Sequence, residues 1–131
     1  MSRHAAATFD LDTWDEEPYD EQEGAKLTRA HVTKTFHGDL EGRGTVEVLM
    51  AYAQEGSAAY VGLERITGTL HGRAGSFVLH HTAIRSGDGE STTWTVVPDS
   101  GTGDLRGLRG EGRITVEPGG GHTFTLDYEL T

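Results

Sequence analysis

Hydrophobic and polar residues alternate along most of this chain, which is the pattern of half-buried β-strands. The clearest example is residues 60–70, which are followed by a four-residue turn at residues 71–74 and by a second alternating run at residues 75–84. Further runs lie at residues 7–11, 27–36, 45–52, 91–97, 105–116 and 122–130. Glycine-rich and polar clusters separate them, so the pattern predicts eight short strands.

Short connections between successive strands predict an all-β fold, a single antiparallel eight-stranded up-and-down barrel over residues 1–131, with a β-sandwich as the alternative. Gly62, Gly68 and Gly110 fall inside predicted strands, where barrels need bends. The segment at about residues 12–25 is acidic and contains Pro18, and we expect it to be an exposed, mobile connection. Trp14 in that segment is expected to cover one end of the barrel.

The composition of the chain limits the classes of partner and of chemistry that we expect. The chain has 131 residues, a formal net charge of −10 and a pI near 5.0. Such a polyanion is repelled by phosphates, so we expect neither nucleic acid nor a membrane surface as a partner. Cysteine is absent, which excludes disulfides and thiolate catalysis. No apolar run approaches a membrane span in length and the first residues carry no signal-peptide pattern, so a cytoplasmic location is expected.

The run at residues 60–84 carries candidate chemistry. If Leu70 pairs with Gly75, Ile66 lies opposite Leu79 and Glu64 lies opposite His81, on a face that is otherwise apolar. A carboxylate beside an imidazole is suited to general acid–base catalysis, with Glu64 and His81 as the candidate catalytic residues. A structural role, in which the buried Glu64–His81 pair fixes the strand register, is favoured over proton transfer. A slip of one residue would replace His81 by His80.

Aromatic residues on the same predicted face form a candidate ligand-binding set. Its members are expected to line a cavity for an apolar or conjugated molecule, and they are Met50, Tyr60, Phe77, Trp94 and Tyr128. A packed barrel core is the alternative. Small residues on the predicted inner face favour the cavity, because they leave volume unfilled: Ala30, Gly62, Gly68 and Ala83.

Other motifs exclude several chemistries. The histidines show no metal-ligand spacing, so no metal site and no cofactor are expected. The glycine-rich segment at residues 101–107 departs from the dinucleotide fingerprint and contains Asp104, which disfavours phosphate. Leu49 and Leu63 fall on the outer face, where they could support a homodimer.

Four stretches resemble a bacterial family of unknown function: residues 60–65, residues 75–79 with His81, residues 94–98 and residues 101–105. The resemblance extends from Leu27 to the end of the chain. Members of that family look like compact barrels akin to allene oxide cyclase. The resemblance therefore implies a barrel, within a wider group that includes cyclases and isomerases with few catalytic side chains. It supplies no catalytic residues that could be carried over to this chain.

These observations together predict a barrel that binds a small apolar or carbonyl-containing molecule in its lumen. The enzymatic version is a cofactor-free cyclase or isomerase, which preorganises its substrate with help from the Glu64–His81 pair. The alternative is a non-catalytic carrier or sensor of lipocalin type. A structural protein with a filled barrel is a third possibility.

Overall fold

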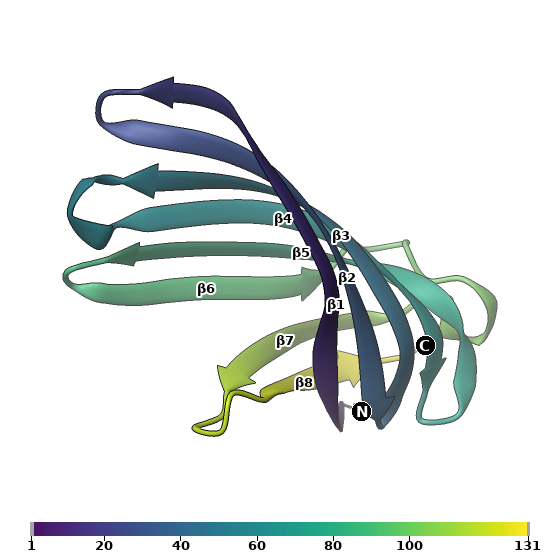
Figure 1. Ribbon diagram of the computed structural model, residues 1–131. Coiled ribbons are helices and arrows are strands. Elements are labelled where there is room, and N and C mark those ends of the chain that lie inside the picture. Colours follow the sequence, from purple (N-terminus) through teal and green to yellow (C-terminus); the bar gives the residue numbers. More distant parts are fainter. Residues whose placement is uncertain (1, 131) are drawn as a thin grey trace.

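Eight antiparallel strands close into one barrel in the computed structural model, which describes residues 2–130 (Figure 1). The strands are β1 (Arg3–Gln22), β2 (Ala25–Gly38), β3 (Leu40–Ala53), β4 (Ala58–Leu70), β5 (Arg73–Ser86), β6 (Gly89–Val96), β7 (Arg109–Val116) and β8 (His122–Glu129). Neighbours in sequence pair with each other, and β8 returns to β1. The predicted up-and-down barrel is confirmed. Within residues 2–130, no helix is long and apolar enough to cross a membrane.

The β4–β5 hairpin has a tighter turn than the sequence predicts. Leu70 pairs with Arg73 rather than with Gly75, so only His71 and Gly72 form the turn. Both have positive φ, 48° and 79°, as two-residue hairpin turns commonly require. The predicted pairing is therefore wrong by two residues. Because side chains alternate between the two faces of a strand, a shift of two residues leaves every side chain on its predicted face.

The expected acidic connection is instead regular structure. Residues through Gln22 belong to β1 and pair with β2 along a hairpin that turns at residues 23–24. On its other side β1 pairs with β8 only from Arg3 to Phe9, so the rest of the strand is a sheet edge. Acidic side chains and Pro18 are typical of exposed edges, where they prevent pairing with other chains. The acidic run thus reflects protection of an edge rather than a loop.

One end of the barrel is solidly packed. Its fully buried side chains include three phenylalanines and several leucines: Phe36, Phe77, Phe124, Leu40, Leu70, Leu79 and Leu126. The β6–β7 connection closes this end, because Leu105 in the 3-10 turn η2 (Gly103–Leu105) and Leu108 are both buried. The backbone N–H of Thr102 donates to the Ser76 carbonyl at 2.8 Å and fixes the connection to β5. The strand predicted from Leu105 therefore begins later, at Arg109.

The opposite end is more open. A separate, smaller cluster of buried residues lies there, made of Ala30, Val32, Val46 and Val48. The hairpins β1–β2, β3–β4 and β5–β6 extend toward this end, and β7–β8 diverges from β6 (Figure 1). Only Thr95 and Glu111 form a register pair between β6 and β7. The connections at this end are short, and the 3-10 turn η1 (Gln54–Gly56) buries no side chain.

Candidate functional site in the barrel lumen

A cavity of about 160 Å³ lies inside the open end of the barrel. Most of its lining is apolar or aromatic: Phe9, Leu11, Trp14, Val32, Val46, Val48, Met50, Tyr60 and Trp94. Lys34, His81 and His122 supply polar atoms. Trp14, from the acidic part of β1, is about half exposed and contributes to the lining, so one of the two tryptophans lies near the surface of the site. An apolar cavity with a few converging polar groups is the usual form of a small-molecule site.

Three ionisable side chains from three strands meet at the base of this cavity. Lys34 of β2 donates from Nζ to Oε1 of Glu64 on β4 at 3.1 Å. His81 of β5 places Nε2 3.4 Å from the same oxygen, a distance of electrostatic contact rather than of a well-formed hydrogen bond. The three residues are 5%, 0% and 3% exposed. Burying a charged group is costly unless an opposite charge pairs with it. The Lys34–Glu64 ion pair therefore offsets the cost of burying these two charges.

Glu64 lies behind the cavity rather than in its wall. A Cβ atom placed on Gly44 would come within 2.2 Å of Oε2 of Glu64, so the carboxylate occupies space that Gly44 leaves free in β3. The ring of Phe36 borders the same space. Lys34 and His81 line the cavity and Glu64 does not. Glu64 therefore holds the two lining groups from behind.

His81 is the buried polar group with the most unused bonding capacity. Neither ring nitrogen has a hydrogen-bond partner within the described residues, and the same is true of Oε2 of Glu64. The imidazole stacks on Trp94, with ring centroids 4.0 Å apart and planes 11° apart. Burial lowers the pKa of His81 below 6.5, although nearby Glu64 partly opposes the shift. The ring is thus neutral at pH 7 and can both accept and donate a proton.

Aromatic rings surround the polar groups. The Lys34 ammonium lies 4.7 Å from the centroid of Phe9 and 4.9 Å from that of Trp94, within the range of cation–π attraction. Tyr60 meets His81 edge-on at 5.7 Å. Burial raises the pKa of Tyr60 to about 12, so its hydroxyl stays neutral in this lumen.

The structure brings together only part of the predicted site. Met50, Tyr60, His81 and Trp94 line the cavity, whereas Glu64 lies behind it. Phe77 and Tyr128 belong to the buried core outside this cavity. The Tyr128 hydroxyl hydrogen-bonds Nδ1 of His71 in the β4–β5 turn. The roles of the lining residues in binding remain predictions.

Sequence reasoning missed Lys34. The signal was present, because Lys34 follows Ala30 and Val32 and precedes Phe36 at alternating positions of one strand face. A lysine on a face that buries its other members needs a partner of opposite charge. The strand pairing predicted from the sequence places only His81 beside Glu64 and gives no indication that Lys34 reaches the same carboxylate.

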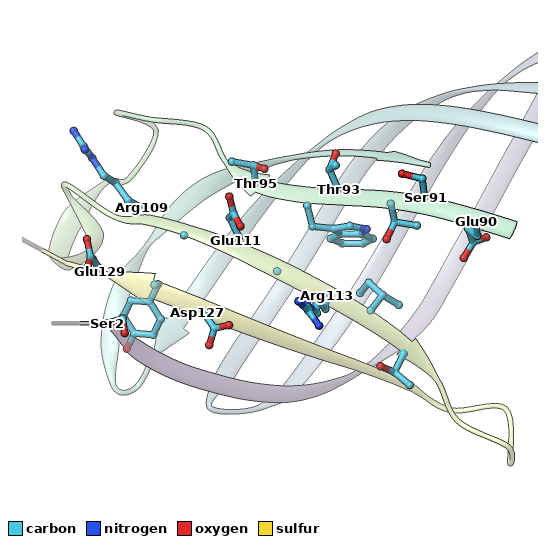
Figure 2. A pocket seen from close by; sticks show the side chains of 17 residues that line it. Ser2, Glu90, Ser91, Thr93, Thr95, Arg109, Glu111, Arg113, Asp127 and Glu129 are labelled. Atoms are coloured by element: carbon cyan, nitrogen blue, oxygen red, sulfur yellow. The ribbon is translucent and has the colours of Figure 1, made fainter. Parts of the chain in front are cut away.

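A larger hollow of about 860 Å³ runs along the surface where β6 and β7 diverge (Figure 2). Its labelled side chains are polar or charged, among them Glu90, Thr93, Glu111, Arg113 and Asp127. Trp94 lines both this groove and the lumen cavity. Despite its size the groove is a hydrophilic surface feature, whereas the smaller lumen cavity combines apolar walls with buried ionisable groups.

No group of three possible metal ligands occurs among the residues that the structure describes. His31 is about half exposed, and its Nδ1 hydrogen-bonds Oε2 of Glu47 on β3, away from the lumen groups. The buried ionisable groups at the base of the lumen cavity are a lysine, a carboxylate and an imidazole. An ammonium group is a cation rather than a ligand, so this set fits an organic molecule better than a metal ion.

Comparison with known proteins relates this chain to one protein family and to solved structures. The model of a family described as "Protein of unknown function (DUF3224)" matches residues 5–128. A solved structure from Shewanella oneidensis MR-1, described as a protein of unknown function from the DUF3224 family, is 35% identical with a TM-score of 0.86. The match covers 100% of this chain and 99% of that one. No curated protein matches this chain.

Proposed function

This chain belongs to the DUF3224 family, whose function is unknown, and we propose that its lumen binds a small, mainly apolar molecule with one polar head. The cavity of about 160 Å³, with Lys34 and His81 in an otherwise largely apolar lining, carries the proposal. An apolar cavity of roughly 150 Å³ can hold one benzene molecule. The preferred ligand is therefore a compound of about one ring.

Charge restricts the polar head of the ligand. The Lys34 ammonium is balanced by Glu64, and burial keeps His81 neutral at pH 7. A charged ligand would enter a largely apolar lumen without a counter-ion of its own, at a high desolvation cost. A neutral carbonyl or hydroxyl group would instead hydrogen-bond to His81 or to the remaining N–H groups of Lys34. The ligand class is thus neutral, with a single hydrogen-bonding end.

The chain offers an optical readout for binding. It has two tryptophans, Trp14 and Trp94, and both line the cavity. We would titrate the protein with benzaldehyde, acetophenone and phenol, and record tryptophan fluorescence and melting temperature. Saturable quenching and a rise in melting temperature are expected, because a ligand that binds only the folded state stabilises it.

A matched pair of variants locates the binding site. Val48→Phe adds a ring at a residue that lines the cavity, whereas Leu49→Phe adds bulk at the next residue, which is about half exposed on the outer face. Val48→Phe should abolish the saturable response, and Leu49→Phe should leave it unchanged. Equal responses from the two folded variants would place binding outside the lumen and refute the proposal.

Acid–base catalysis is a second candidate function, favoured by the two unpartnered nitrogens of His81. In this version the neutral imidazole moves a proton between two carbons of a bound carbonyl compound, as an isomerase does, while Glu64 positions it. Cyclohex-3-enone is a suitable probe, since moving its double bond into conjugation changes its ultraviolet absorbance. Turnover that His81→Gln abolishes without loss of binding would support an isomerase. Binding without turnover of this probe favours the carrier alternative.

A further inference from the structure

We propose that Lys34 forms a reversible imine with small aldehydes or ketones in the lumen, which makes it a covalent carbonyl-binding residue. This inference rests on the proposed function, because the carbonyl compound must first enter the cavity. It specifies the polar head of the ligand as a carbonyl group and assigns a chemical role to a residue that the sequence motifs did not indicate.

The surroundings of Lys34 carry the proposal. Its side chain is 6% exposed, yet Lys34 lines the cavity, so a bound molecule can reach it while bulk water is largely excluded. Its one hydrogen-bonding partner among the described side chains is Oε1 of Glu64. The rings of Phe9 and Trp94 border the nitrogen. A lysine amine that borders an apolar pocket and has a base beside it is suited to Schiff-base formation with a bound carbonyl compound.

The Glu64 carboxylate is placed to take the proton that must leave the amine. Transfer of one proton from Nζ to Oε1 over 3.1 Å leaves a neutral amine with a free lone pair and a protonated carboxyl group. The amine lone pair then attacks the carbonyl carbon, and the C–N bond forms as the carbonyl π electrons move to oxygen. A proton from nitrogen neutralises this oxygen, which gives a carbinolamine.

Dehydration completes the step. The protonated Glu64 returns its proton, directly or through His81, to the carbinolamine hydroxyl group, and this group leaves as water while the C=N bond forms. The product is an iminium ion beside the Glu64 carboxylate, so the buried charges remain paired as they were before reaction. Water re-entering the cavity reverses the sequence, and no oxidant or reductant is needed.

The lysine content of the chain provides an internal control. Only Lys26 and Lys34 are present, and Lys26 is exposed on β2. We would incubate the intact protein with benzaldehyde, reduce any imine with sodium cyanoborohydride, and map benzylated residues by peptide mass spectrometry. Labelling of Lys34 is expected to exceed that of Lys26 by about tenfold when the aldehyde is limiting, because the cavity concentrates it.

Two variants separate the lumen from the surface. Lys34→Arg keeps the charge but removes the reactive amine, and it should lose the lumen label while Lys26 is labelled as before. Lys26→Arg should retain the full Lys34 label. The wild-type peptide map decides the question even if Lys34→Arg fails to fold, because it compares two lysines within one protein.

The outcomes distinguish this inference from the proposed function. Quenching of tryptophan fluorescence by benzaldehyde without a label on Lys34 would overturn the imine and leave lumen binding intact. Failure of every carbonyl and hydroxyl probe to bind would overturn the proposed function as well. Equal labelling of Lys26 and Lys34 would show surface reactivity only and would also overturn the imine.

Discussion

The two ends of the barrel are built from the same alternating strands, but one is filled and the other contains a cavity. At the packed end the inward positions hold rings and leucines, and the segment at residues 97–108 adds Leu105 and Leu108. At the open end a smaller cluster of one alanine and three valines, with Met50 and Tyr60 partly buried, shares the cavity with the rings of Phe9 and Trp94. The packed end therefore differs from the end with the cavity in two ways: it has more large inward side chains, and a connection folds across it.

The ionisable groups lie where the two ends meet. Along β4, Glu64 stands between Gly62 on the open side and the fully buried Ile66 on the packed side. Lys34 and His81 reach the same carboxylate from β2 and β5 and line the cavity. The packed end thus holds the Glu64 carboxylate in place. The open end gives a ligand access to Lys34 and His81, the two groups that contact this carboxylate.

Removing the carboxylate is expected to have the largest effect on stability. Glu64→Ala leaves Lys34 buried without a counter-ion, and breaking a buried ion pair in this way costs roughly 3–5 kcal/mol of unfolding free energy. Chemical denaturation of the purified variant measures this cost. A loss below about 1 kcal/mol would mean that the Lys34 ammonium reaches solvent and that the pair is not buried in solution.

Replacing both partners provides the control. The double variant Glu64→Leu with Lys34→Met removes both charges and keeps apolar bulk, and such replacements are often neutral or stabilising by about 1–4 kcal/mol. It should therefore be much more stable than Glu64→Ala. If both variants were equally unstable, the loss would come from packing around Gly44 rather than from an unpaired charge.

The next largest effect is expected from shortening buried side chains, which should cost more stability at the packed end than at the open end. Leu126→Ala at the packed end removes a fully buried side chain and leaves a new cavity, at a cost of about 3 kcal/mol. Met50→Ala at the open end enlarges an existing cavity beside a partly buried residue, and it should cost about 1 kcal/mol. Urea denaturation of both variants tests the comparison, and equal losses would contradict the distinction between a packed and an open end.

Strand alternation was enough to predict the barrel, but not its detailed pairing. The eight strands could be recognised because alternation follows directly from one buried face. The β4–β5 register was missed because His71 adopts a positive φ, which is uncommon for a residue other than glycine. The acidic half of β1 was missed because charge and Pro18 mark an exposed edge strand as readily as a loop.

The candidate site was predictable in part for a similar reason. Face alternation places Met50, Tyr60, His81 and Trp94 inward, and they do line the cavity. It does not report position along the barrel axis, so Phe77 and Tyr128 were grouped with them although they belong to the packed core. The pairing of Lys34 with Glu64 joins strands β2 and β4, which are not adjacent, and local patterns carry no information about such contacts.

A single methyl group tests how tightly the packed end is closed. A Cβ atom on Gly75 would come within 2.1 Å of the Thr102 backbone oxygen, so Gly75→Ala must displace the closing segment. A cost of about 1–3 kcal/mol is expected, as for other overpacked sites. Gly87→Ala is the matched control because nothing lies within 4 Å of its Cβ, and it should change stability by less than about 0.5 kcal/mol. Equal effects would show that the segment yields without cost.

The smallest expected effect is the pH dependence that His81 contributes to stability. Burial lowers the folded-state pKa of this imidazole below its value of 6.5 in the unfolded chain. Below pH 6.5 the unfolded chain therefore binds the proton more readily than the folded one, and protonation favours unfolding. The contribution is complete above pH 6.5 and is lost as the pH falls from 6.5 through the lowered pKa. His81→Gln should remove this slope, so the difference in unfolding free energy between wild type and variant should shrink as the pH falls. A difference that stays constant with pH would mean that His81 titrates alike in both states, and the imidazole would then be open to water rather than sealed against Trp94 at the base of the cavity.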